Sequence, residues 1–514
     1  MKFPPRGLAV PLLLLFIHSF FSAAVDAQTK KKAPPRKKPA VRKAAPKRAP
    51  APKLETASGV SFEERLNSLV NGSTARASEA SIQIVEVETG RVVGERNPNM
   101  AVVPASNMKL FTTAAALDLL RPGFEVTTTV FARGEVDSSG TLNGDLKIVG
   151  RGDPTIGGRF HDGQATAVMQ GWATDLKRAG IKTVHGNLIF EYGYFDTEYT
   201  HPTWPRDQLV NWYEAPVAAF SMQEGCVMVR VLPSKPGQPC VVQFEPPNDF
   251  LTLQNTCVTG RGLPFITRHI GTNNIIVRGG VPARSGATEV FVAIENPIHY
   301  FASVTNETFG RDGILVDGQI IITPRDTQAG WRAISQHTTP MNVLVYVVNK
   351  KSQNHYAEQV LKILGAEVKK NGSFTSGANV IREWVTTKVG VPANEFSMTD
   401  GSGMSRNNLA SANSFIRVLR YMWKSPHRQD FVSSMPYTGD PDSKFGNRLR
   451  NPPYARQVYA KTGYIAGVAT LSGYVHAQSG KIYAFSFLFN RYRVGVYAVY
   501  RLEDEMLKEI ISKG

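Results

Sequence analysis

Two polar residues at the start of an apolar segment could supply a nucleophile and its base. The segment "PASNMKLFTTAAALDLL" (104–120) places Ser106 three residues before Lys109. A serine hydroxyl is a weak nucleophile and needs a neighbouring base, which a lysine one helical turn away can provide once it has lost its proton. A Ser-x-x-Lys pair occurs roughly once or twice by chance in a chain this long, so the pair alone decides nothing.

Two later motifs bring groups of complementary chemistry. "AKTGY" places Lys461-Thr462-Gly463 at the end of an expected strand, where it offers a cation, a hydroxyl and a glycine along which a substrate backbone can lie. Between the two, "KKSQNHYAEQ" holds Ser352 and Asn354 at a helix start. Ser-x-x-Lys, Ser-x-Asn and Lys-Thr-Gly in this order are the motif set of serine enzymes that form acyl intermediates. The three together favour a nucleophilic serine over an ordinary helix start.

The elements around these motifs predict a domain that an insertion interrupts. Residues 80–95 alternate apolar and polar around a Thr-Gly turn and predict a β-hairpin, and residues 107–120 predict a helix. From 126 to 335 short β-rich runs alternate with Gly, Pro and Asn. Helices, three strands and a closing helix then follow. We therefore expect a split α/β domain, residues 58–125 and 336–514, with a β-rich insert of one or two modules at 126–335.

The N-terminal residues predict export. Residues 1–27 have basic residues, then an apolar run, then Val25 and Ala27 at small-x-small spacing, which is typical of a cleaved signal peptide. An uncleaved N-terminal anchor is the alternative. Residues 28–57 predict a disordered tail, because they are rich in Pro, Ala and basic residues and have little to bury.

This tail dominates the charge of the chain. Its residues 29–53 carry eleven of the lysines and arginines and no acid, and the signal region adds +1, so +5 of the formal +17 remains for residues 54–514. Nucleic-acid binding would be the usual inference from such a basic run, but export argues against it. Attraction to an anionic envelope surface and a plain solvated linker both remain open.

The sequence predicts neither a specific disulfide nor a metal site. Cys226, Cys240 and Cys257 are an odd set without a diagnostic spacing, so one disulfide and none are both compatible with export. The sequence has no H-E-x-x-H and no paired C-x-x-C. We expect no metal or organic cofactor.

Longer segments carry a family resemblance. "VGRGDPTI", "YEAPVAAFSMQEGCVMV", "SQNHYAEQVLKILG", "DGSGMSRNNL" and "AKTG" resemble the D-alanyl-D-alanine carboxypeptidase/endopeptidase family, the low-molecular-mass class C penicillin-binding proteins of the penicillin-binding protein 4 type. The resemblance covers about residues 60–510. It implies an α/β (α+β) fold, a transpeptidase/β-lactamase-like domain in which helices flank an antiparallel sheet, with a large insert after the first motif.

The resemblance also implies roles for the motif residues. Ser106 would be the nucleophile and Lys109 its base. The backbone N–H groups of Ser106 and Tyr464 would form the oxyanion hole. Ser352 would pass a proton to the leaving amine. The remaining substrate contacts would come from Asn354, which holds the substrate amide, and from Lys461, Thr462 and Gly463, which receive the terminal carboxylate and backbone.

Three positions are less well defined. Ser405-Arg406-Asn407 also fits Ser-x-Asn, although the family pattern S-x-N-x-x-A-E/D favours Ser352. Arg406 matches a substrate-contacting arginine of the family. Glu191 falls where the family usually has an aspartate facing the amino group of a diamino-acid side chain, and an ordinary surface acid is the alternative. Tyr464 is bulkier than expected, which leaves side-chain selectivity open.

These features predict an exported, periplasmic or envelope serine DD-peptidase. We expect it to cleave D-Ala-D-Ala through an acyl-enzyme, with cross-linked peptides of peptidoglycan as a further candidate substrate, and to bind β-lactam antibiotics covalently. A serine β-lactamase or esterase with the same motifs is one alternative. A non-enzymatic envelope-binding protein is the other.

Overall fold

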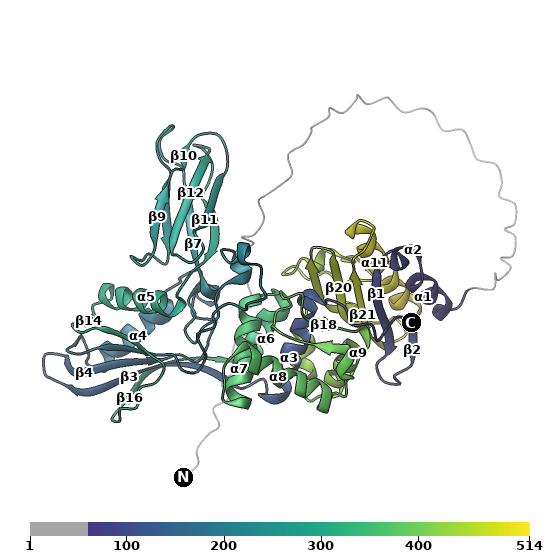
Figure 1. Ribbon diagram of the computed structural model, residues 1–514, viewed down its shortest axis with the longest axis horizontal. Coiled ribbons are helices and arrows are strands. Elements are labelled where there is room, and N and C mark those ends of the chain that lie inside the picture. The colour runs from purple at the N-terminus through teal and green to yellow at the C-terminus, as the bar shows by residue number, and fades with distance from the viewer. Residues whose placement is uncertain (1–59) are drawn as a thin grey trace, which may run out of the picture. The chain divides into compact units, whose positions relative to one another are not determined.

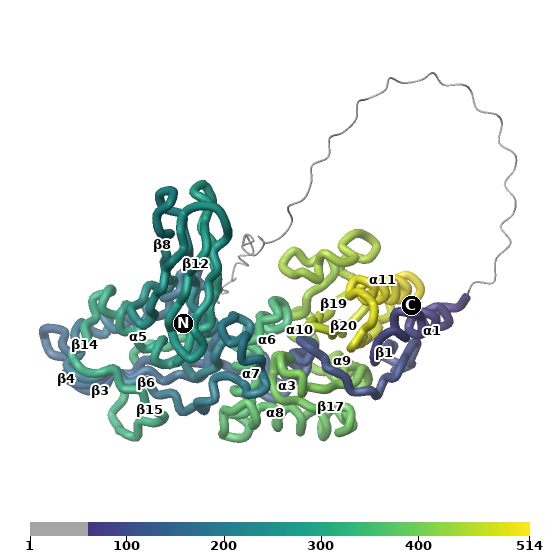
Figure 2. Tube along the Cα trace, turned by 45° about the horizontal axis from the view of Figure 1, so that its top comes forward, coloured from purple at the N-terminus to yellow at the C-terminus, as the bar shows by residue number. Residues whose placement is uncertain are grey.

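A five-stranded antiparallel sheet joins the two ends of the described chain. The computed structural model describes residues 60–514 (Figure 1). The strand order is β19-β20-β21-β1-β2. The bounds are β1 Glu79–Glu86, β2 Val92–Arg96, β19 Val458–Ile465, β20 Val468–His476 and β21 Ile482–Asn490. The predicted hairpin at 80–95 is therefore β1–β2, with Gly90 at φ +78° in its turn. In Figure 2 the purple α1 lies beside the yellow α11.

Apolar residues at nearly every position of β21 give this sheet two buried faces. Ile82 and Ile84 pair with Phe487 and Phe485 on one face, which packs against α1 (Phe62–Val70) and α11 (Val496–Lys513). Leu488, on the opposite face of β21, belongs to the core beneath α9 (Ala412–Lys424). Successive strand residues point to opposite faces, so a strand buried on both sides must be apolar at nearly every position.

A helical layer adjoins the sheet. It contains α3 (Lys109–Leu119), α6 (Met341–Lys350), α7 (Asn354–Lys369), α8 (Phe374–Glu383) and α10 (Arg428–Ser433). The short helix η1 (Ala105–Met108) leads into α3 and contacts β19 and β20. Its neighbour α3 is buried from Lys109 to Leu117, and its alanines allow α6 and α7 to approach closely. Phe111 packs against Phe396 and Phe415, with ring centroids 4.5 and 4.6 Å apart.

The inserted region contains a seven-stranded sheet and two helices. The main strand order is β14-β5-β4-β3-β16, and β6 joins β4 to β15. The bounds are β3 Glu125–Val136, β4 Thr141–Val149, β5 Thr183–Val184, β6 Leu188–Glu191, β14 Leu315–Val316, β15 Ile320–Thr323 and β16 Arg332–Pro340. Helices α4 (Ala167–Arg178) and α5 (Pro297–Arg311) pack on its core. The predicted boundary at 335/336 falls inside β16, which pairs with β3 as far as Pro340.

Two smaller sheets complete the insert. One has the order β13-β7-β8, with β7 Cys226–Leu232, β8 Val241–Glu245 and β13 Thr288–Ala293. The other, here called the β9–β12 module, contains β9 Thr252–Asn255, β10 Val258–Thr259, β11 Pro264–Arg268 and β12 Asn274–Val281. The three cysteines are buried free thiols, and the sulfurs of Cys240 and Cys257 lie 2.8 Å apart.

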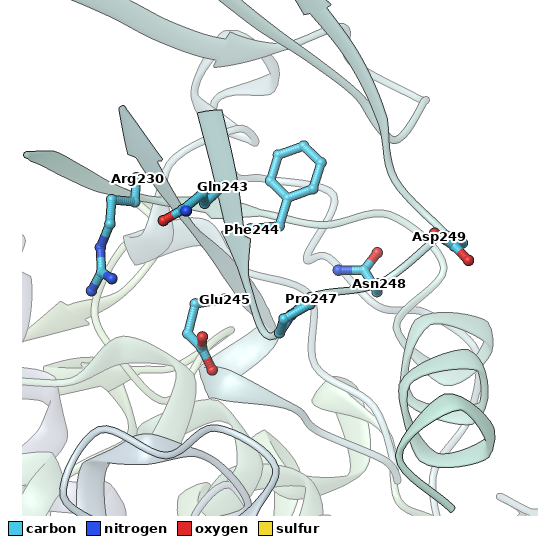
Figure 3. A pocket seen from close by; sticks show the side chains of 7 residues that line it. All are labelled: Arg230, Gln243, Phe244, Glu245, Pro247, Asn248 and Asp249. Atoms are coloured by element: carbon cyan, nitrogen blue, oxygen red, sulfur yellow. The ribbon is translucent and has the colours of Figure 1, made fainter. Parts of the chain in front are cut away.

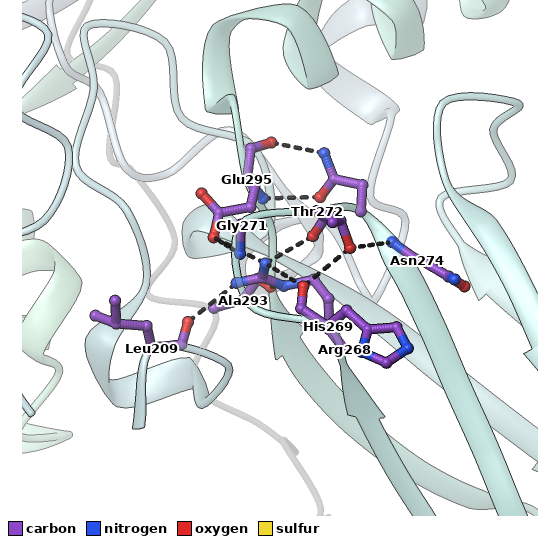
Figure 4. A network of polar contacts seen from close by, with 9 residues as sticks. Leu209, Arg268, His269, Gly271, Thr272, Asn274, Ala293 and Glu295 are labelled. Atoms are coloured by element: carbon purple, nitrogen blue, oxygen red, sulfur yellow. Dashed lines mark hydrogen bonds and ion pairs between the residues drawn. The ribbon is translucent and has the colours of Figure 1, made fainter. Parts of the chain in front are cut away.

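A buried arginine fixes the base of the β9–β12 module. Figure 4 shows Arg268 at the end of β11 with its guanidinium surrounded by acceptors. It donates to the carbonyl oxygen of Ala293 at 2.7 Å, to that of Leu209 at 3.2 Å and to the Glu295 carboxylate at 2.8 Å. These bonds join β11 to β13 and to the segment near Leu209, so the module is held in one orientation against the rest of the insert.

The remaining elements are short. They are α2 Ser73–Arg76, β17 Phe396–Ser397, β18 Leu409–Ala410, the 3₁₀ turns η2 Gly158–Phe160, η3 Arg206–Gln208, η4 Trp212–Glu214, η5 Gln223–Gly225, η7 Ala393–Glu395 and η8 Phe445–Asn447, and the π-turn η6 Trp384–Lys388. Strands β17 and β18 pair and so bring together the two ends of the loop at 398–408.

Some sequence predictions are not addressed by this structure. The signal peptide at 1–27 and the basic tail at 28–57 lie outside the described residues. Within 60–514, no helix combines the length and apolarity needed to span a bilayer. Val60–Gly514 forms one compact unit, so its division into a split catalytic domain and an insert stays a prediction.

Phe111 tests the importance of the α3 packing. Phe111→Ala should lower the free energy of unfolding by about 3–5 kcal/mol, because the cavity left between α3 and its neighbours cannot collapse fully. Urea denaturation would measure this. Tyr497→Ala, at a side chain that is 74% exposed, is the control and should change stability by less than about 0.5 kcal/mol. Similar losses in the two variants would contradict the packing described here.

Candidate active site

Ser106 and Lys109 lie on one face of the helix start. Ser106 belongs to η1, Lys109 begins α3, and the Lys109 Nζ is 3.0 Å from the Ser106 Oγ. Ser106 is partly exposed, whereas Lys109 is fully buried. Ala105, just before the serine, has φ +46°, a left-handed conformation that a non-glycine residue adopts at a cost. The hydroxyl is thus presented toward solvent with an amine directly behind it.

The second motif meets the first through Asn354. The Lys109 Nζ donates to the Asn354 Oδ1 at 2.7 Å. The Asn354 Nδ2 donates in turn to the carbonyl oxygen of Tyr213, at 2.8 Å, from the inserted region. Both ends of the amide are therefore engaged, which fixes its orientation at the N-terminus of α7.

The third motif meets the second through Ser352. The Lys461 Nζ lies 2.8 Å from the Ser352 Oγ and 2.8 Å from the carbonyl oxygen of Thr462. Ser352 is partly exposed and has φ +56°. Because Ser352 and Asn354 are two residues apart, these contacts bring all three motifs into one cluster.

Two glycines allow backbone to lie directly against Ser106. A Cβ at Gly463 would come within 3.0 Å of the Ser106 nitrogen and 2.8 Å of the Pro104 carbonyl oxygen. A Cβ at Gly403 would come within 1.9 Å of the Ala105 carbonyl oxygen. Both positions therefore require glycine, and both β19 and the 398–408 loop pack against the backbone immediately before the serine.

The alternative Ser-x-Asn triplet has a different environment. Ser405 is fully buried, and its Oγ accepts from the Thr203 hydroxyl at 2.7 Å and from the Asn407 amide at 3.2 Å. Its amide donates to Asp400 at 2.6 Å. These contacts stabilise the 398–408 loop. The geometry therefore favours Ser352, as predicted, over Ser405.

The other predicted substrate residues lie either near β19 or in β6 of the insert. Thr462 and Tyr464 lie on the Lys-Thr-Gly strand, and Tyr464 is 59% exposed. Arg406 donates to the carbonyl oxygen of Ala466 at 2.7 Å and so reaches across to the turn after that strand. Glu191 lies in β6 of the insert, where its carboxylate is 3.3 Å from the Lys147 Nζ. Its contacts hold the insert together and do not join it to the motif cluster.

The comparison with known families identifies the chain. The sequence profile of the D-Ala-D-Ala carboxypeptidase 3 (S13) family matches residues 63–506. The chain belongs to this family. A D-alanyl-D-alanine carboxypeptidase of Actinomadura sp. (strain R39) is 30% identical over 461 residues, which cover 86% of this chain and 83% of the relative. The protein is accordingly a hydrolase that acts on peptidoglycan peptides.

Solved structures confirm the predicted fold. The crystal structure of penicillin binding protein 4 (dacB) from Haemophilus influenzae superposes with a TM-score of 0.75 at 22% identity, covering 87% of this chain and 99% of that one. The same protein complexed with a novel β-lactam gives a TM-score of 0.70 at 22% identity, covering 85% and 98%.

Burial lowers the pKa values of the two motif lysines of the S13 enzyme, Lys109 and Lys461. Desolvation lowers the pKa of Lys109 to about 7, against the opposing charges of Glu358 and Asp400. Burial also holds the pKa of Lys461 well below its usual range, with a further lowering from the nearby Lys109. A lysine with a pKa near neutrality can release its proton and act as a base.

Glu358 is a supporting residue that the motif search did not single out. Its buried carboxylate accepts from the amides of Gly401 at 2.8 Å and Ser402 at 2.7 Å. The Ser402 carbonyl oxygen then accepts from the Lys109 Nζ at 2.7 Å. Desolvation, together with the charge of Asp400, raises the pKa of Glu358 to about 8. The signal was present in the sequence, since Glu358 stands four residues after Asn354 on the same helix face.

The inserted region also contributes to the wall of the site. The Trp204 Nε1 donates to Asp400 at 2.9 Å, and Thr203 donates to Ser405. Asp400 also accepts from the amide of Gly403 at 2.9 Å, so the insert and the 398–408 loop share one buried carboxylate. No pattern in residues 201–214 indicated this role.

A separate pocket lies elsewhere in the insert. Figure 3 shows it between β7, β8 and the segment that follows β8, lined by Arg230, Gln243, Phe244, Glu245, Pro247, Asn248 and Asp249. None of the motif residues lines it. In the described part of the chain, no group of three or more His, Cys, Asp or Glu side chains is arranged to hold a metal ion.

Glu358 provides a test of the electrostatics at Lys109. In its ionised form Glu358 raises the pKa of Lys109. Because the pKa of Glu358 is itself raised to about 8, only part of the population carries that charge where Lys109 titrates, so Glu358→Gln should lower the pKa of Lys109 modestly and make the free amine available at lower pH. The acidic limb of kcat/KM for a D-Ala-D-Ala peptide should shift down by a few tenths of a pH unit, on the order of 0.3–0.5. Glu367→Gln, on the same helix but paired with Arg151, is the matched control. An unchanged or upward shift for Glu358→Gln would contradict the assignment of Lys109 as the titrating base.

Proposed function

We propose that the enzyme is an exported serine DD-peptidase that cleaves D-Ala-D-Ala through an acyl-enzyme on Ser106. The observation that carries the proposal is the shared lysine contact. Lys109 lies within hydrogen-bond distance of both the Ser106 Oγ and the Asn354 Oδ1, at 3.0 and 2.7 Å. An amine that is buried, close to its serine and lowered in pKa is suited to removing the proton of a hydroxyl.

Acylation begins when neutral Lys109 takes the Ser106 proton. The Ser106 oxygen then attacks the carbonyl carbon of the penultimate D-Ala, and the carbonyl oxygen becomes an oxyanion. The backbone N–H groups of Ser106 and Tyr464 would stabilise this charge. The close approach that Gly463 allows to the Ser106 nitrogen supports that placement.

Collapse of the tetrahedral intermediate releases D-Ala. The leaving amine takes up the proton that Lys109 removed from Ser106, and Ser352 would relay it, which returns Lys109 to its neutral form. The Ser352 hydroxyl is held 2.8 Å from the Lys461 Nζ. Asn354 would hold the substrate amide. Lys461 and Thr462 would receive the terminal carboxylate of the substrate. Water then attacks the acyl-enzyme, which returns Ser106 to its free form and releases the shortened peptide.

The same nucleophile accounts for two further proposed activities. Attack on a cross-link whose acyl donor is D-Ala would make the enzyme an endopeptidase. Attack on a β-lactam carbonyl would acylate Ser106 covalently, which the family membership and the β-lactam complex of the Haemophilus protein support.

Side-chain selectivity is proposed to involve Arg406 and Glu191. Arg406 is exposed at the turn after β19, next to the strand that would receive the substrate. Glu191 is partly buried, and a substrate amino group would have to compete with Lys147 for its carboxylate. Glu191 should therefore contribute less to binding a substrate amino group than an unpaired acid would.

The two Ser-x-Asn candidates can be separated by substitution. Ser106→Ala should abolish peptidase activity and penicillin labelling. Ser352→Ala and Asn354→Ala should each lower the acylation rate by about 10²–10⁴, the range for loss of positioned proton transfer. The matched control is Asn407→Ala, in the second triplet, which should stay near wild type. Acylation by labelled penicillin in stopped-flow or quench measurements would report each rate.

The outcomes of that experiment distinguish the rival functions. Labelling of Ser106→Ala on another serine would contradict the nucleophile, and a larger loss in Asn407→Ala would contradict the motif assignment. Rapid turnover of a cephalosporin without lasting acylation would indicate a β-lactamase. Failure of wild type to acylate or to shorten muropeptides, measured by mass spectrometry, would indicate a non-enzymatic role.

The basic tail is proposed to increase attachment to an anionic envelope surface. Residues 29–53 carry eleven basic residues and no acid. Deleting them should leave turnover of small soluble peptides unchanged but reduce co-sedimentation with isolated cell walls at low salt. Added salt should remove the difference, because screening acts over roughly 8 Å at physiological ionic strength. Equal sedimentation of both forms at low salt would make the tail a passive spacer.

A further inference from the structure

The free end of the β9–β12 module exposes apolar side chains. Leu263 is 83% exposed, Phe265 49% and Val258 42%. They lie at one end of the sheet, because Val258 pairs with Gly280 and the Gly280 amide donates to the Leu263 carbonyl oxygen. Figure 1 shows β10 toward the end of the module that is remote from α5. Adjoining exposed apolar side chains on a soluble protein often mark an interaction surface.

The opposite face of the same sheet is buried in the core of the insert. Ile275 and Val277 are fully buried in the core of the insert. Arg268 fixes the base of the module through its bonds to Ala293 and Glu295 (Figure 4). The apolar residues at the free end are therefore presented by an anchored sheet and are not part of an unpacked core.

Cations surround these apolar residues without any acid among them. Residues 250–288 contain four arginines and no Asp or Glu. Arg261 lies in the loop before Leu263, and the Arg278 guanidinium stacks 4.4 Å above the Phe265 ring. The turn that contains Lys235 packs against β10 through a 2.8 Å bond from the Gly237 amide to the Thr259 carbonyl oxygen. We call Val258, Leu263 and Phe265, with Lys235, Arg261 and Arg278, the module tip.

We propose that the module tip binds the surface of a bilayer containing anionic phospholipids. Exposed apolar side chains ringed by cations are the composition with which proteins enter the headgroup region of such a membrane. A soluble polyanion would engage the arginines but would leave Leu263 in water. A second copy of the same tip would bring like charges together.

This inference goes beyond the hydrolase function and relies only on the proposed export. It would give the enzyme a folded membrane contact in addition to the tail. Because the tip lies in the insert and not among the motif residues, peptidase turnover can serve as the folding control for tip variants.

The first test is flotation of the full mature chain with vesicles. The vesicles contain phosphatidylglycerol and phosphatidylcholine, with phosphatidylcholine alone as the comparison. Leu263→Ser combined with Phe265→Ser should weaken partitioning on the order of tenfold, because less apolar surface leaves water. Leu315→Ser is the matched control, since Leu315 is 56% exposed on β14 of the same insert. Every variant retains the tail, and raised salt suppresses the contribution of the tail.

The second test locates the contact. An environment-sensitive dye on Leu263→Cys should shift to the blue with anionic vesicles, and the same dye on Leu315→Cys should not. The three native thiols are buried, which favours labelling at the new cysteine. Equal flotation of the tip variant and Leu315→Ser would overturn the proposal. A dye response to polyphosphate but not to vesicles would also overturn it and would indicate that the tip binds a soluble polymer. A dye response that depends only on protein concentration would overturn it too and would indicate contact with a second copy of the chain.

Discussion

Complete burial of the Lys109 amine is the constraint on which the rest of the site depends. An ammonium removed from water loses several kcal/mol of hydration unless acceptors replace the solvent. Three acceptors do so here, from the Ser106 hydroxyl, the Asn354 amide and the Ser402 carbonyl. Burial lowers the pKa of Lys109 to about 7, so that the amine can release its proton, and the three acceptors hold it next to the serine. The burial that makes the amine reactive is therefore also a cost to the stability of the folded chain.

The inserted region satisfies part of this constraint. Tyr213 fixes the Asn354 amide, and Trp204 orients the Asp400 carboxylate beneath the 398–408 loop. Gln353, inside the Ser-x-Asn motif, donates to Glu224, which also pairs with Arg159. Removing the insert would leave these buried polar groups without partners, which costs more than the hydrogen bonds themselves contribute. The region predicted as an insert is therefore part of the site.

The order and types of the motif residues allowed the site to be predicted, because each motif is local and ends a recognisable element. The strands that carry Lys461 and its neighbours were predictable from their apolar runs and turns. The sequence marked Glu358 only by its spacing from Asn354, and its contacts with the amides of Gly401 and Ser402 could not be foreseen, since they depend on how α7 meets the 398–408 loop. Helix α5 was missed because its Thr, Val and Phe residues favour strands, and packing on the sheet overrides that preference. The Lys147 partner of Glu191 could not be foreseen because it comes from the neighbouring strand β4.

The position of β1 in the central sheet has a consequence for how the chain matures. β1 pairs along its whole length with β21, with Glu79 opposite Asn490, so the two partners are synthesised far apart in time. The ribosome delivers the serine well before the Lys-Thr-Gly strand. Pairings between such distant segments are slow, because loop closure precedes any stabilising contact. A catalytically competent cleft therefore forms only after β19, β20 and β21 have been made, and a product truncated before Lys461 would contain the nucleophile without the means to use it.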